Sequence, residues 1–426
     1  MAALTNGFYS TLSTVSDILK EYYLGPVAEQ LNNEVFLMSR LESKSEDLVG
    51  KRAYVPLHYG RSGGIGARAE RDELPSAGNQ RYSKAVYDLK YLYGRVQVTG
   101  PAMAKTKNEA GAFLQALKSE LDGVRNDLKK DVARQVYGDG TAQIVQCGTT
   151  TSDTEIVLAT GLAGGAEAIR KGQLYVGMLV DIGTVADVDT ISTTPRTITA
   201  VDYAAGTITI SGAAVSTTSS HYITRSGAGV DGAATANGSR SNEIDGLKRL
   251  VSGAATYVGE INAATETWWD NKRIAVSGAL TANLEEIQKG LNLVRLEGAT
   301  PSLMLTSLGI QREIYSNLQD QVRYMDPNTY NFASGFKTLE YAGMPVVSDI
   351  DAPYGTLYIL DESTMKVFSD QDWHFLDADG QTLRQVSNYD AFEAIMARYL
   401  NLGVTKRNNQ VVLTGITVDG GTDAGI

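Results

Sequence analysis

The most informative segment of the chain reads YGRSGGIGARAERDELPSAGNQRY, residues Tyr59–Tyr82, and is rich in glycine and in charge. Loops of this length without secondary structure are uncommon in compact domains. A phosphate-binding loop needs a strand before it and a helix N-terminus after it. Residues Lys51–Tyr59 do predict a strand, but Ser83–Thr99, rich in Val, Tyr and Leu, predict a second strand and no helix. We therefore expect a long, charged hairpin arm that reaches away from its own domain.

Length and composition indicate an ordinary globular protein with two or three domains. The chain has 426 residues, of which 43% are hydrophobic and 20% are charged, and its net charge of -11 disfavours indiscriminate binding to nucleic acid or anionic membrane. Cys147 is the only cysteine, which rules out an intrachain disulfide and fits a reducing cytoplasm. The N-terminus does not have a signal-peptide pattern, and no apolar run is long enough to span a bilayer. We expect the protein to be made and to act in soluble form.

The first half of the chain contains two predicted helical regions. Residues 1–45 carry apolar side chains at helical spacing, interrupted at Gly25-Pro26, which predicts two short amphipathic helices, either an N-terminal arm or ordinary core helices. Residues 106–138 predict the clearest helix, with a capping box at its start and a Gly-Asp-Gly stop at its end. One apolar stripe follows this helix and comprises Phe113, Leu117, Leu121, Val124, Leu128, Val132 and Val136.

Residues 151–240 differ in composition, because Thr, Ser, Gly, Val and Ile replace the helix formers. Short strands are predicted at Gln173–Ile182, Arg196–Asp202, Thr207–Ser211 and His221–Thr224, with a hairpin turn at 204–206. We expect a small inserted all-β domain, a barrel or a sandwich, followed by a flexible linker over 227–241. Its predicted core comprises Leu174, Val176, Val180, Ile198, Ile208, Ile210 and Ile223. The alternative is that these strands extend the sheet of the neighbouring domain.

The rest of the chain predicts a mixed α/β region. Helices are expected at Thr281–Glu297 and Ser307–Gln319. Strands are expected at Ser302–Ser307, Phe336–Ser348, Gly355–Leu360 and Met365–Phe368. Residues 388–417 predict a strand, a turn at Asn408-Asn409 and a final strand.

The sequence contains few residues or motifs that indicate a catalytic or metal-binding site. The three histidines, His58, His221 and His374, lie in separate segments without a carboxylate or second histidine at metal spacing, and the zinc, thiol and serine-hydrolase motifs are absent. Cys147 has no candidate partner, and Asp187-Val188-Asp189 lacks the glycine and distal glutamate of a calcium loop. Core packing explains Trp268-Trp269 better than a binding platform does. We predict no catalytic, cofactor or metal site, with an unseen active site in the α/β region as an alternative.

Three stretches, taken in order, resemble the major capsid proteins of tailed bacteriophages, which have the Hong Kong 97 fold. The first, residues 91–141, runs from YLYGRVQVTG into the long predicted helix. The second is ETWWDN, residues 266–271, and the third is EYAGMPVVSDIDAPYGTLYILDESTMKVF, residues 340–368. No single stretch is diagnostic, but their order and spacing extend the resemblance over nearly the whole chain.

The resemblance implies an α+β fold with five parts, to which this chain adds the inserted β-rich domain. These parts are an N-terminal arm (1–46), an extended β-hairpin loop (47–99), a peripheral domain with a spine helix (100–150), an axial domain (241–390, with a peripheral return near 241–255) and C-terminal strands returning to the peripheral domain (391–426). The inserted domain (151–240) is not part of the minimal fold, and we expect it on the outer surface of a shell. A fused scaffolding segment, which some relatives carry before the N-terminal arm, is not apparent.

The resemblance also implies a structural function and no enzymatic one. The subunit is expected to assemble as hexamers and pentamers into an icosahedral virion shell around double-stranded DNA, without sequence-specific binding and without membrane. It implies a separate scaffolding protein, a portal and possible decoration proteins as partners, and synthesis in the host cytoplasm. An encapsulin-like cellular compartment shell is the alternative.

Candidate contact residues between subunits lie in the loop. They are Arg61, Arg68, Glu70, Arg71, Asp72, Glu73, Arg81 and Lys84. Interleaved charges of both signs suit ion pairs that repeat across a symmetric shell. Some relatives crosslink a loop lysine to an asparagine of a neighbour, but Lys84, Asn408 and Asn409 give no sign that they meet, and we predict no crosslink.

Overall fold

The structure is a computed structural model, and it describes residues 36–42, 45–47, 50–101, 110–160, 164–184, 195–226, 242–252, 257–279, 284–319, 339–377 and 383–418. The chain divides into two compact units, Met1–Asn33 and Glu34–Ile426. The first unit lies outside the described residues, as do the 227–241 linker and Asp187–Asp189. Of the two helices expected over residues 1–45, the structure describes helix only at 36–42. The following description concerns the second unit.

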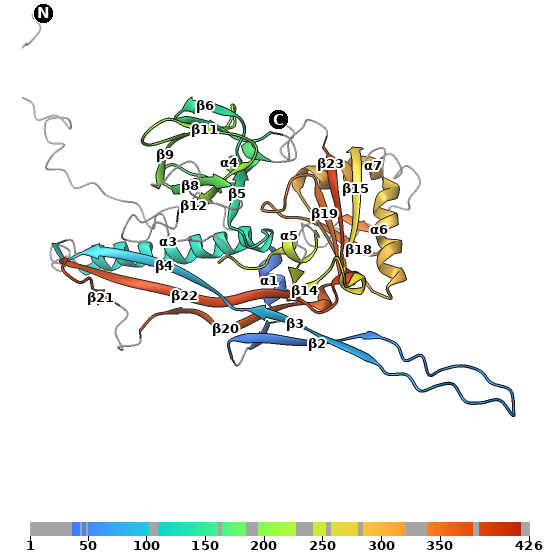
Figure 1. The fold of residues 1–426 in the computed structure, drawn as a ribbon. Helices are drawn as coiled ribbons and strands as arrows, with labels where there is room; N and C mark the ends of the chain where they lie inside the picture. The colour runs from blue at the N-terminus through green and yellow to red at the C-terminus, as the bar shows by residue number, and fades with distance from the viewer. Residues whose placement is uncertain are drawn as a thin grey trace, which may run out of the picture. The chain divides into compact units, whose positions relative to one another are not determined.

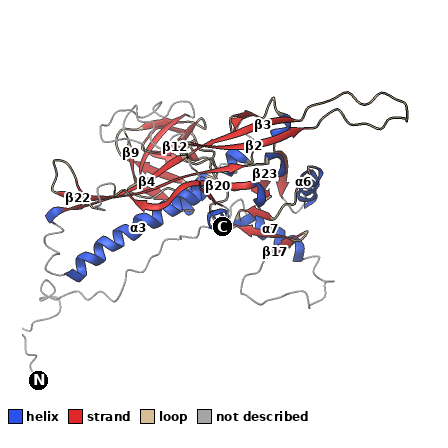
Figure 2. Ribbon diagram, turned by 90° about the horizontal axis from the view of Figure 1, so that it is seen from below, coloured by secondary structure: helices blue, strands red, loops and turns tan. Residues whose placement is uncertain are grey.

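A five-stranded sheet packs against one long helix (Figures 1 and 2). The sheet contains β1 (Ser45–Asp47), β20 (Met365–Phe375), β22 (Ala391–Val404), β21 (Arg384–Gln385) and β4 (Lys90–Thr99), with β22 paired to β20, β21 and β4. Helix α3 (Ala110–Val136) packs on β4, where a Cβ on Gly94 would lie 2.6 Å from Leu128 Cδ1 and 2.7 Å from Val124 Cγ1. Glycine at position 94 therefore allows this close approach of helix and strand.

The apolar stripe predicted for α3 is buried to different degrees along the helix. Val132 and Val136 are buried, whereas Leu121, Val124 and Leu128 are half-buried. The side chains of 102–119 lie outside the described residues. The short helix α1 (Phe36–Glu42) contributes Leu37, Met38 and Leu41 to the same core.

A second, mixed sheet of six strands occupies the α/β region. Its order is β15 (Lys272–Ala279), β23 (Val411–Thr417), β19 (Thr356–Leu360), β16 (Leu303–Thr306), β18 (Met344–Ser348) and β17 (Leu339–Tyr341). Helices α6 (Leu284–Leu296) and α7 (Leu308–Gln319) bury Ile287, Leu291 and Ile314 against one face. Leu303 and Leu305 of β16 point to the other core, so both faces of the central strands are buried, which explains their nearly continuous apolar sequences.

Residues 143–225 form a sheet of their own. Its order is β5 (Gln143–Gln146), β12 (His221–Arg225), β8 (Leu179–Thr184), β9 (Arg196–Asp202), β10 (Thr207–Ile210) and β7 (Glu155–Val157), accompanied by α4 (Gly165–Arg170) and the ribbon β6 (Thr150–Asp153)–β11 (Val215–Thr217). No described strand of this sheet pairs with the five-stranded sheet, which contradicts a simple extension of that sheet. A separate hydrophobic cluster forms the core of this β-rich region. The first strand of the region, β5, pairs with its last strand, β12, with Val145 opposite Ile223.

Several predicted elements of this β-rich region differ from the structure. The sheet begins at Gln143, ahead of the expected boundary at 151. The strand expected from Gln173 begins only at Leu179, because the chain turns through Gly172 and Gly177, both at positive φ. Val176 is 58% exposed on that turn and is not a core residue, whereas the other six predicted core residues are buried.

The run Ser83–Thr99, predicted as one strand, is two strands with different partners. β3 (Arg81–Asp88) pairs with β2 (Arg52–Gly60), whereas β4 pairs with β22. The change of partner occurs at Leu89, where Asn401 Nδ2 donates to the carbonyl oxygen of Asp88 at 2.6 Å. The side-chain amide replaces the ladder hydrogen bond that the break removes.

Two further predictions need correction. Of the one strand expected over 336–348, the described part, residues 339–348, forms two strands, because Ala342 and Gly343, both at positive φ, close a tight hairpin between β17 and β18. The expected division at 390 also differs from the sheet pairing, since β20 lies in the five-stranded sheet and β23 in the six-stranded sheet. The chain therefore crosses between the two sheets twice near its end, after β19 and again after β22.

A buried polar network joins three of these regions at the end of α3. Arg134 pairs with Glu243, and Asp131 accepts hydrogen bonds from Arg134 at 3.2 Å and from Arg225 of β12 at 3.1 Å. Burial alone would raise the pKa of Asp131, but these two guanidinium groups hold it below its ordinary value. Asp131 is therefore charged and ties the β-rich region to the helix.

Candidate functional site

Among the described residues, the hairpin β2–β3 is held to the rest of the chain at its base. Ala53, Leu57 and Ala85 are buried there, and the Val86 N–H donates to Gly259 O at 3.0 Å. Arg52 forms ion pairs with Asp88 at 2.7 Å and with Glu260 at 3.0 Å. Beyond Gly60 the two arms of the loop extend away from the sheets (Figure 1). The described hairpin thus has a fixed base and a projecting tip.

Glycines of the tip lie where the two backbones approach each other. A Cβ on Gly64 would lie 3.0 Å from Gly78 N, and one on Gly78 would lie 2.7 Å from Gly63 N. Near the far end, Asp72 N–H donates to Ala69 O at 3.1 Å, and Ala69 N–H donates to Asp72 Oδ2 at 3.2 Å, which closes a turn. Gly64 and Gly78 therefore allow this close backbone approach, whereas a Cβ on Gly63 would meet no atom within 4 Å. No regular secondary structure covers residues 61–80.

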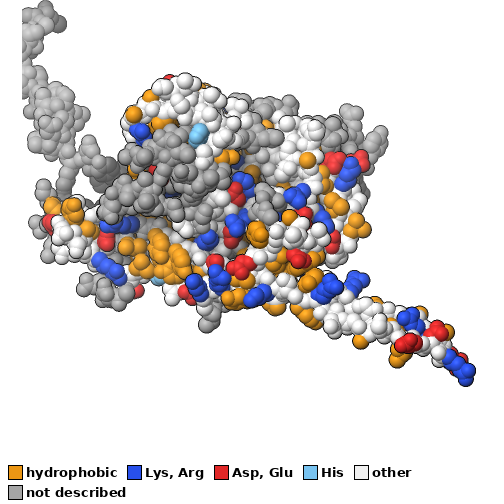
Figure 3. All heavy atoms as spheres, in the orientation of Figure 1, with side chains coloured by type: hydrophobic (Ala, Val, Ile, Leu, Met, Phe, Trp, Pro, Cys, Tyr) orange, Lys and Arg blue, Asp and Glu red, His pale blue; other side chains and the backbone are white. Residues whose placement is uncertain are grey.

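All eight candidate contact residues are exposed. Among the described residues, none of these side chains forms an ion pair; Arg68 Nε instead donates to Glu73 O at 2.9 Å, and Lys84 Nζ lies 5.2 Å from the centre of the Tyr54 ring. Basic and acidic side chains alternate along the tip (Figure 3). Charges of both signs are thus available to a partner.

The outer face of the hairpin carries aromatic side chains that we did not predict as contact residues. Tyr54, His58 and Tyr82 are exposed, and the His58 and Tyr82 rings lie 5.0 Å apart. His58 and Tyr82 are register partners across the two strands. Alternation along β2, with Ala53 and Leu57 inward and Tyr54 and His58 outward, is the signal that could have revealed this face.

A second aromatic surface lies on the five-stranded sheet, on the face opposite α3. Tyr91 and Tyr93 are 53% and 55% exposed, and both rings meet Tyr399 edge to face, at 5.2 and 6.2 Å. His374 lies 5.6 Å from the same Tyr399 ring. Partial burial and the neighbouring Tyr399 raise the pKa of Tyr93. We call these four residues the tyrosine face; such exposed aromatic groups are typical of interaction surfaces.

Residues that could support chemistry are dispersed. No group of three or more His, Cys, Asp or Glu within the described ranges is placed to hold a metal ion. His221 accepts from the Thr218 backbone at 3.0 Å, and Cys147 is buried, which raises the pKa of its thiol to about 12. Trp269 is buried, with its Nε1 donating to Val258 O at 3.0 Å, while Trp268 is only half-buried.

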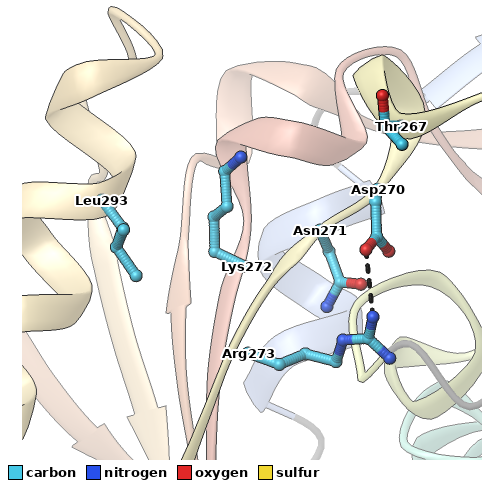
Figure 4. Close-up of a pocket in the computed structure, with 6 residues that line it drawn as sticks. All are labelled: Thr267, Asp270, Asn271, Lys272, Arg273 and Leu293. Atoms are coloured by element: carbon cyan, nitrogen blue, oxygen red, sulfur yellow. Dashed lines mark hydrogen bonds and ion pairs between the residues drawn. The ribbon is translucent and has the colours of Figure 1, made fainter.

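A polar hollow of about 300 Å³ separates α6 from the segment 267–273 (Figure 4). Its charged side chains are engaged by neighbours, because Arg273 pairs with Asp270 at 3.0 Å and Lys272 pairs with Glu297 at 2.7 Å. These pairs leave the hollow without a convergent set of free groups for catalysis. In the part of the chain that the structure describes, no helix is long and apolar enough to cross a membrane.

Comparison with known proteins was informative at the level of structure only. No family model and no curated protein matches the sequence. A chain of the cyanophage A-1(L) capsid asymmetric unit matches with a TM-score of 0.60 and 15% identity, over 96% of this chain and 99% of that chain. The capsid of the native GTA particle matches with a TM-score of 0.48 and 10% identity, over 96% and 100%. The capsid of cyanophage P-SCSP1u matches with a TM-score of 0.47 and 9% identity, over 94% of both chains. This chain therefore has the mixed α+β fold of a phage capsid subunit, as found in cyanophage A-1(L).

Proposed function

We propose that the protein is the major capsid protein of a tailed bacteriophage. In this proposal it is a structural protein, not an enzyme, and it assembles as hexamers and pentamers into an icosahedral shell around double-stranded DNA. The observation that carries the proposal is the fold match to the cyanophage A-1(L) capsid chain, which extends over nearly the full length of both chains. The fixed base and projecting tip of β2–β3 support it, because an arm of this kind suits contact with another subunit.

The parts of the Hong Kong 97 fold can be assigned under this proposal. Helix α3 acts as the spine helix of a peripheral domain built on the five-stranded sheet, and the six-stranded sheet with α6 and α7 forms the axial domain. The region 143–225 is an inserted module on the outer surface of the shell. β22 and β23 link the peripheral and axial domains, since each belongs to a different sheet.

The proposed assembly contacts involve two exposed surfaces, the charged tip and the tyrosine face. Residues 61–84, which comprise the charged tip and the start of β3, lie over an adjacent subunit, where their arginines meet aromatic and acidic side chains. Arg and Tyr are the residues most enriched in the energetically dominant parts of interfaces, and a guanidinium group over a tyrosine ring is favourable. The tyrosine face offers such rings on an open sheet face. Each contact is weak alone but is repeated at every equivalent position of the shell.

The partners of the shell are also proposals. The net charge of -11 keeps the inner wall from adhering to packaged DNA, so DNA is enclosed without sequence-specific binding. A separate scaffolding protein, a portal and, where present, a decoration protein complete the particle. The protein is made in the host cytoplasm and ends in the virion.

Assembly of the full chain tests the proposal. Purified protein should sediment as capsomers or shells and appear as rings or closed particles by negative-stain electron microscopy. The double variant Tyr91→Ala/Tyr93→Ala should fold normally but assemble poorly, whereas Tyr175→Ala, another exposed tyrosine, should assemble as the unmodified chain does. A stable monomer at every concentration, with or without co-expressed scaffolding protein, would contradict a capsid function. Nuclease-protected double-stranded DNA in particles isolated from infected cells supports a phage shell, whereas a protein cargo would indicate an encapsulin-like compartment.

A further inference from the structure

The outward face of the β-rich region carries a hollow with a defined set of side chains. Strands β7, β10 and β9 lie side by side, so Glu155, Thr209 and Ala200 form one row across them, and Val157, Thr207 and Asp202 form the next. The opposite face of these strands buries Ile156, Ile198 and Ile208 in the core. A hollow of about 590 Å³ lies over the outward rows, with Tyr203 at the turn after β9. Ala200 leaves the floor shallow and unobstructed.

Two carboxylates in this hollow are held in position by the protein. Glu155 Oε1 accepts from the Thr207 hydroxyl at 2.7 Å, and Asp202 Oδ1 accepts from the N–H groups of Ala204 at 2.8 Å and Ala205 at 3.0 Å. Within the described residues, neither second carboxylate oxygen has a hydrogen-bond partner. The backbone donors of Ala205 and Ala204 also lower the pKa of Asp202. Each carboxylate is thus oriented by one oxygen and can accept hydrogen bonds from a ligand with the other.

We propose that this hollow binds a neutral carbohydrate, with a pyranose ring stacked on Tyr203 and its hydroxyl groups donating to Glu155 and Asp202. Tyr203 is 56% exposed and offers an apolar ring face with a polar end, which suits the CH face of a sugar. Hydroxyl donors to carboxylates form strong, charge-assisted hydrogen bonds. The Thr209 side chain lines the same hollow and supplies a hydroxyl, which can donate or accept, whereas the Thr207 hydroxyl donates to Glu155.

The chemistry of the lining selects against other ligands. Two carboxylates and no Lys, Arg or His among the lining residues disfavour phosphates, nucleic acids and acidic sugars. A basic peptide is the main competitor, but exposed ion pairs gain little in water and are weakened by salt. A neutral sugar uses both the ring and the oriented carboxylates, so it exploits more of the surface. This inference concerns the β-rich region alone and does not depend on shell assembly.

Binding to the full-length chain tests the site. We would titrate maltose, lactose, cellobiose and chitobiose into unassembled protein and into particles, with saturation-transfer NMR and calorimetry as readouts. At least one disaccharide should bind, with an affinity that changes less than about twofold between roughly 50 mM and 500 mM salt. Tyr203→Ala and Glu155→Gln should each weaken binding about tenfold or more. The matched control Tyr175→Ala removes a tyrosine that is 49% exposed in the same region but outside the hollow, and it should leave binding unchanged.

Three outcomes would overturn the proposal. One is the absence of binding to all four disaccharides by a chain whose circular dichroism and melting are normal. Another is sugar binding that Tyr203→Ala and Glu155→Gln do not alter. The third is preferential binding of a tetra-arginine peptide, abolished by salt and by Glu155→Gln, which would assign the hollow to basic peptides. Since binding is measured on the unassembled chain as well, failure of shell formation would not affect the result.

Discussion

The Tyr59 ring stacks on the Trp268 indole, with the ring centroids 4.5 Å apart and the planes at 11°. Trp268 in turn is anchored, because its Nε1 donates to Glu266 at 2.5 Å and its ring lies 5.7 Å from buried Trp269. Tyr59 is the last residue of β2 before Gly60, where the register of the two strands shifts. This stack therefore marks the boundary between the fixed base of the hairpin and its projecting tip.

Removal of this stack should loosen the base of the hairpin. Trp268→Ala should cost about 1 kcal/mol in the free energy of unfolding from the lost ring pair and should speed amide exchange of Val86, whose N–H bonds to Gly259. Hydrogen exchange followed by mass spectrometry over 52–60 and 81–88 measures this effect. Tyr175→Ala, which removes a ring that is 49% exposed outside the hairpin, is the control and should leave exchange unchanged. Equal protection in both variants would show that the base is held by other contacts.

Deletion of the tip should separate folding from assembly. Replacement of residues 61–80 by a two-residue turn should leave a soluble, folded subunit, since none of these residues contributes to a hydrophobic cluster of the described chain. The variant should not form closed shells, as judged by negative-stain microscopy and sedimentation. Shells of normal size and yield would remove the proposed role of the tip.

Two glycines give a matched test of how α3 packs. Gly94→Val should destabilise the chain by about 1–3 kcal/mol, because its side chain would overlap Val124 and Leu128. Gly123→Ala lies in the middle of α3 with no atom within 4 Å of the added Cβ, and it should stabilise by about 0.5–1 kcal/mol. Denaturant unfolding of unassembled protein gives both values. Similar effects of the two substitutions would mean that the packing of α3 on β4 is wrong.

The buried thiol should make stability sensitive to alkaline pH. Burial raises the pKa of Cys147 from an ordinary value of 9.0 to about 12, so the unfolded chain loses this proton at lower pH than the folded chain. The contribution of the thiol is therefore complete below pH 9 and declines as the pH rises toward 12, by at most about 1.4 kcal/mol per pH unit. Unfolding of the unmodified chain and of Cys147→Ala at pH 8, 9 and 10 isolates this contribution, because all other titrating groups are shared. Parallel pH profiles of the two proteins would contradict it.

The β-rich region should behave as a separable module. Its end strands β5 and β12 are paired, so replacement of residues 143–226 by a short Gly-Ser bridge spans a small gap. The shortened chain should remain soluble and folded, with Asp131 retaining Arg134 as a partner after the loss of Arg225. Particles formed from it should be less stable to heat. Insoluble protein from several bridge lengths would indicate that the module is integral to the fold.

Elements with local signals were predicted well from the sequence. The spacing of Val124, Leu128 and Val132 predicted α3, and Gly298, at positive φ, ends the region of α6 as expected. The turn at 204–206 lies between β9 and β10, with Gly206 at positive φ. Hydrophobic periodicity and turn residues act over a few positions, so one sequence contains this information. The charge pattern of 61–81 likewise identified an exposed segment.

Features that depend on distant partners required the tertiary structure. The segment 83–99 is rich in Val, Tyr and Leu on both sides of Leu89, and this composition predicts a strand without identifying the strand that lies alongside. For the same reason, the sequence did not predict that β19 and β20, or β22 and β23, belong to different sheets. It also did not predict that Tyr91 and Tyr93 contact Tyr399. Strand pairing is set by non-local backbone hydrogen bonds and by packing across the whole core. A local pattern carries no record of either, so only the folded chain determined which strands pair and which distant residues meet on its surface.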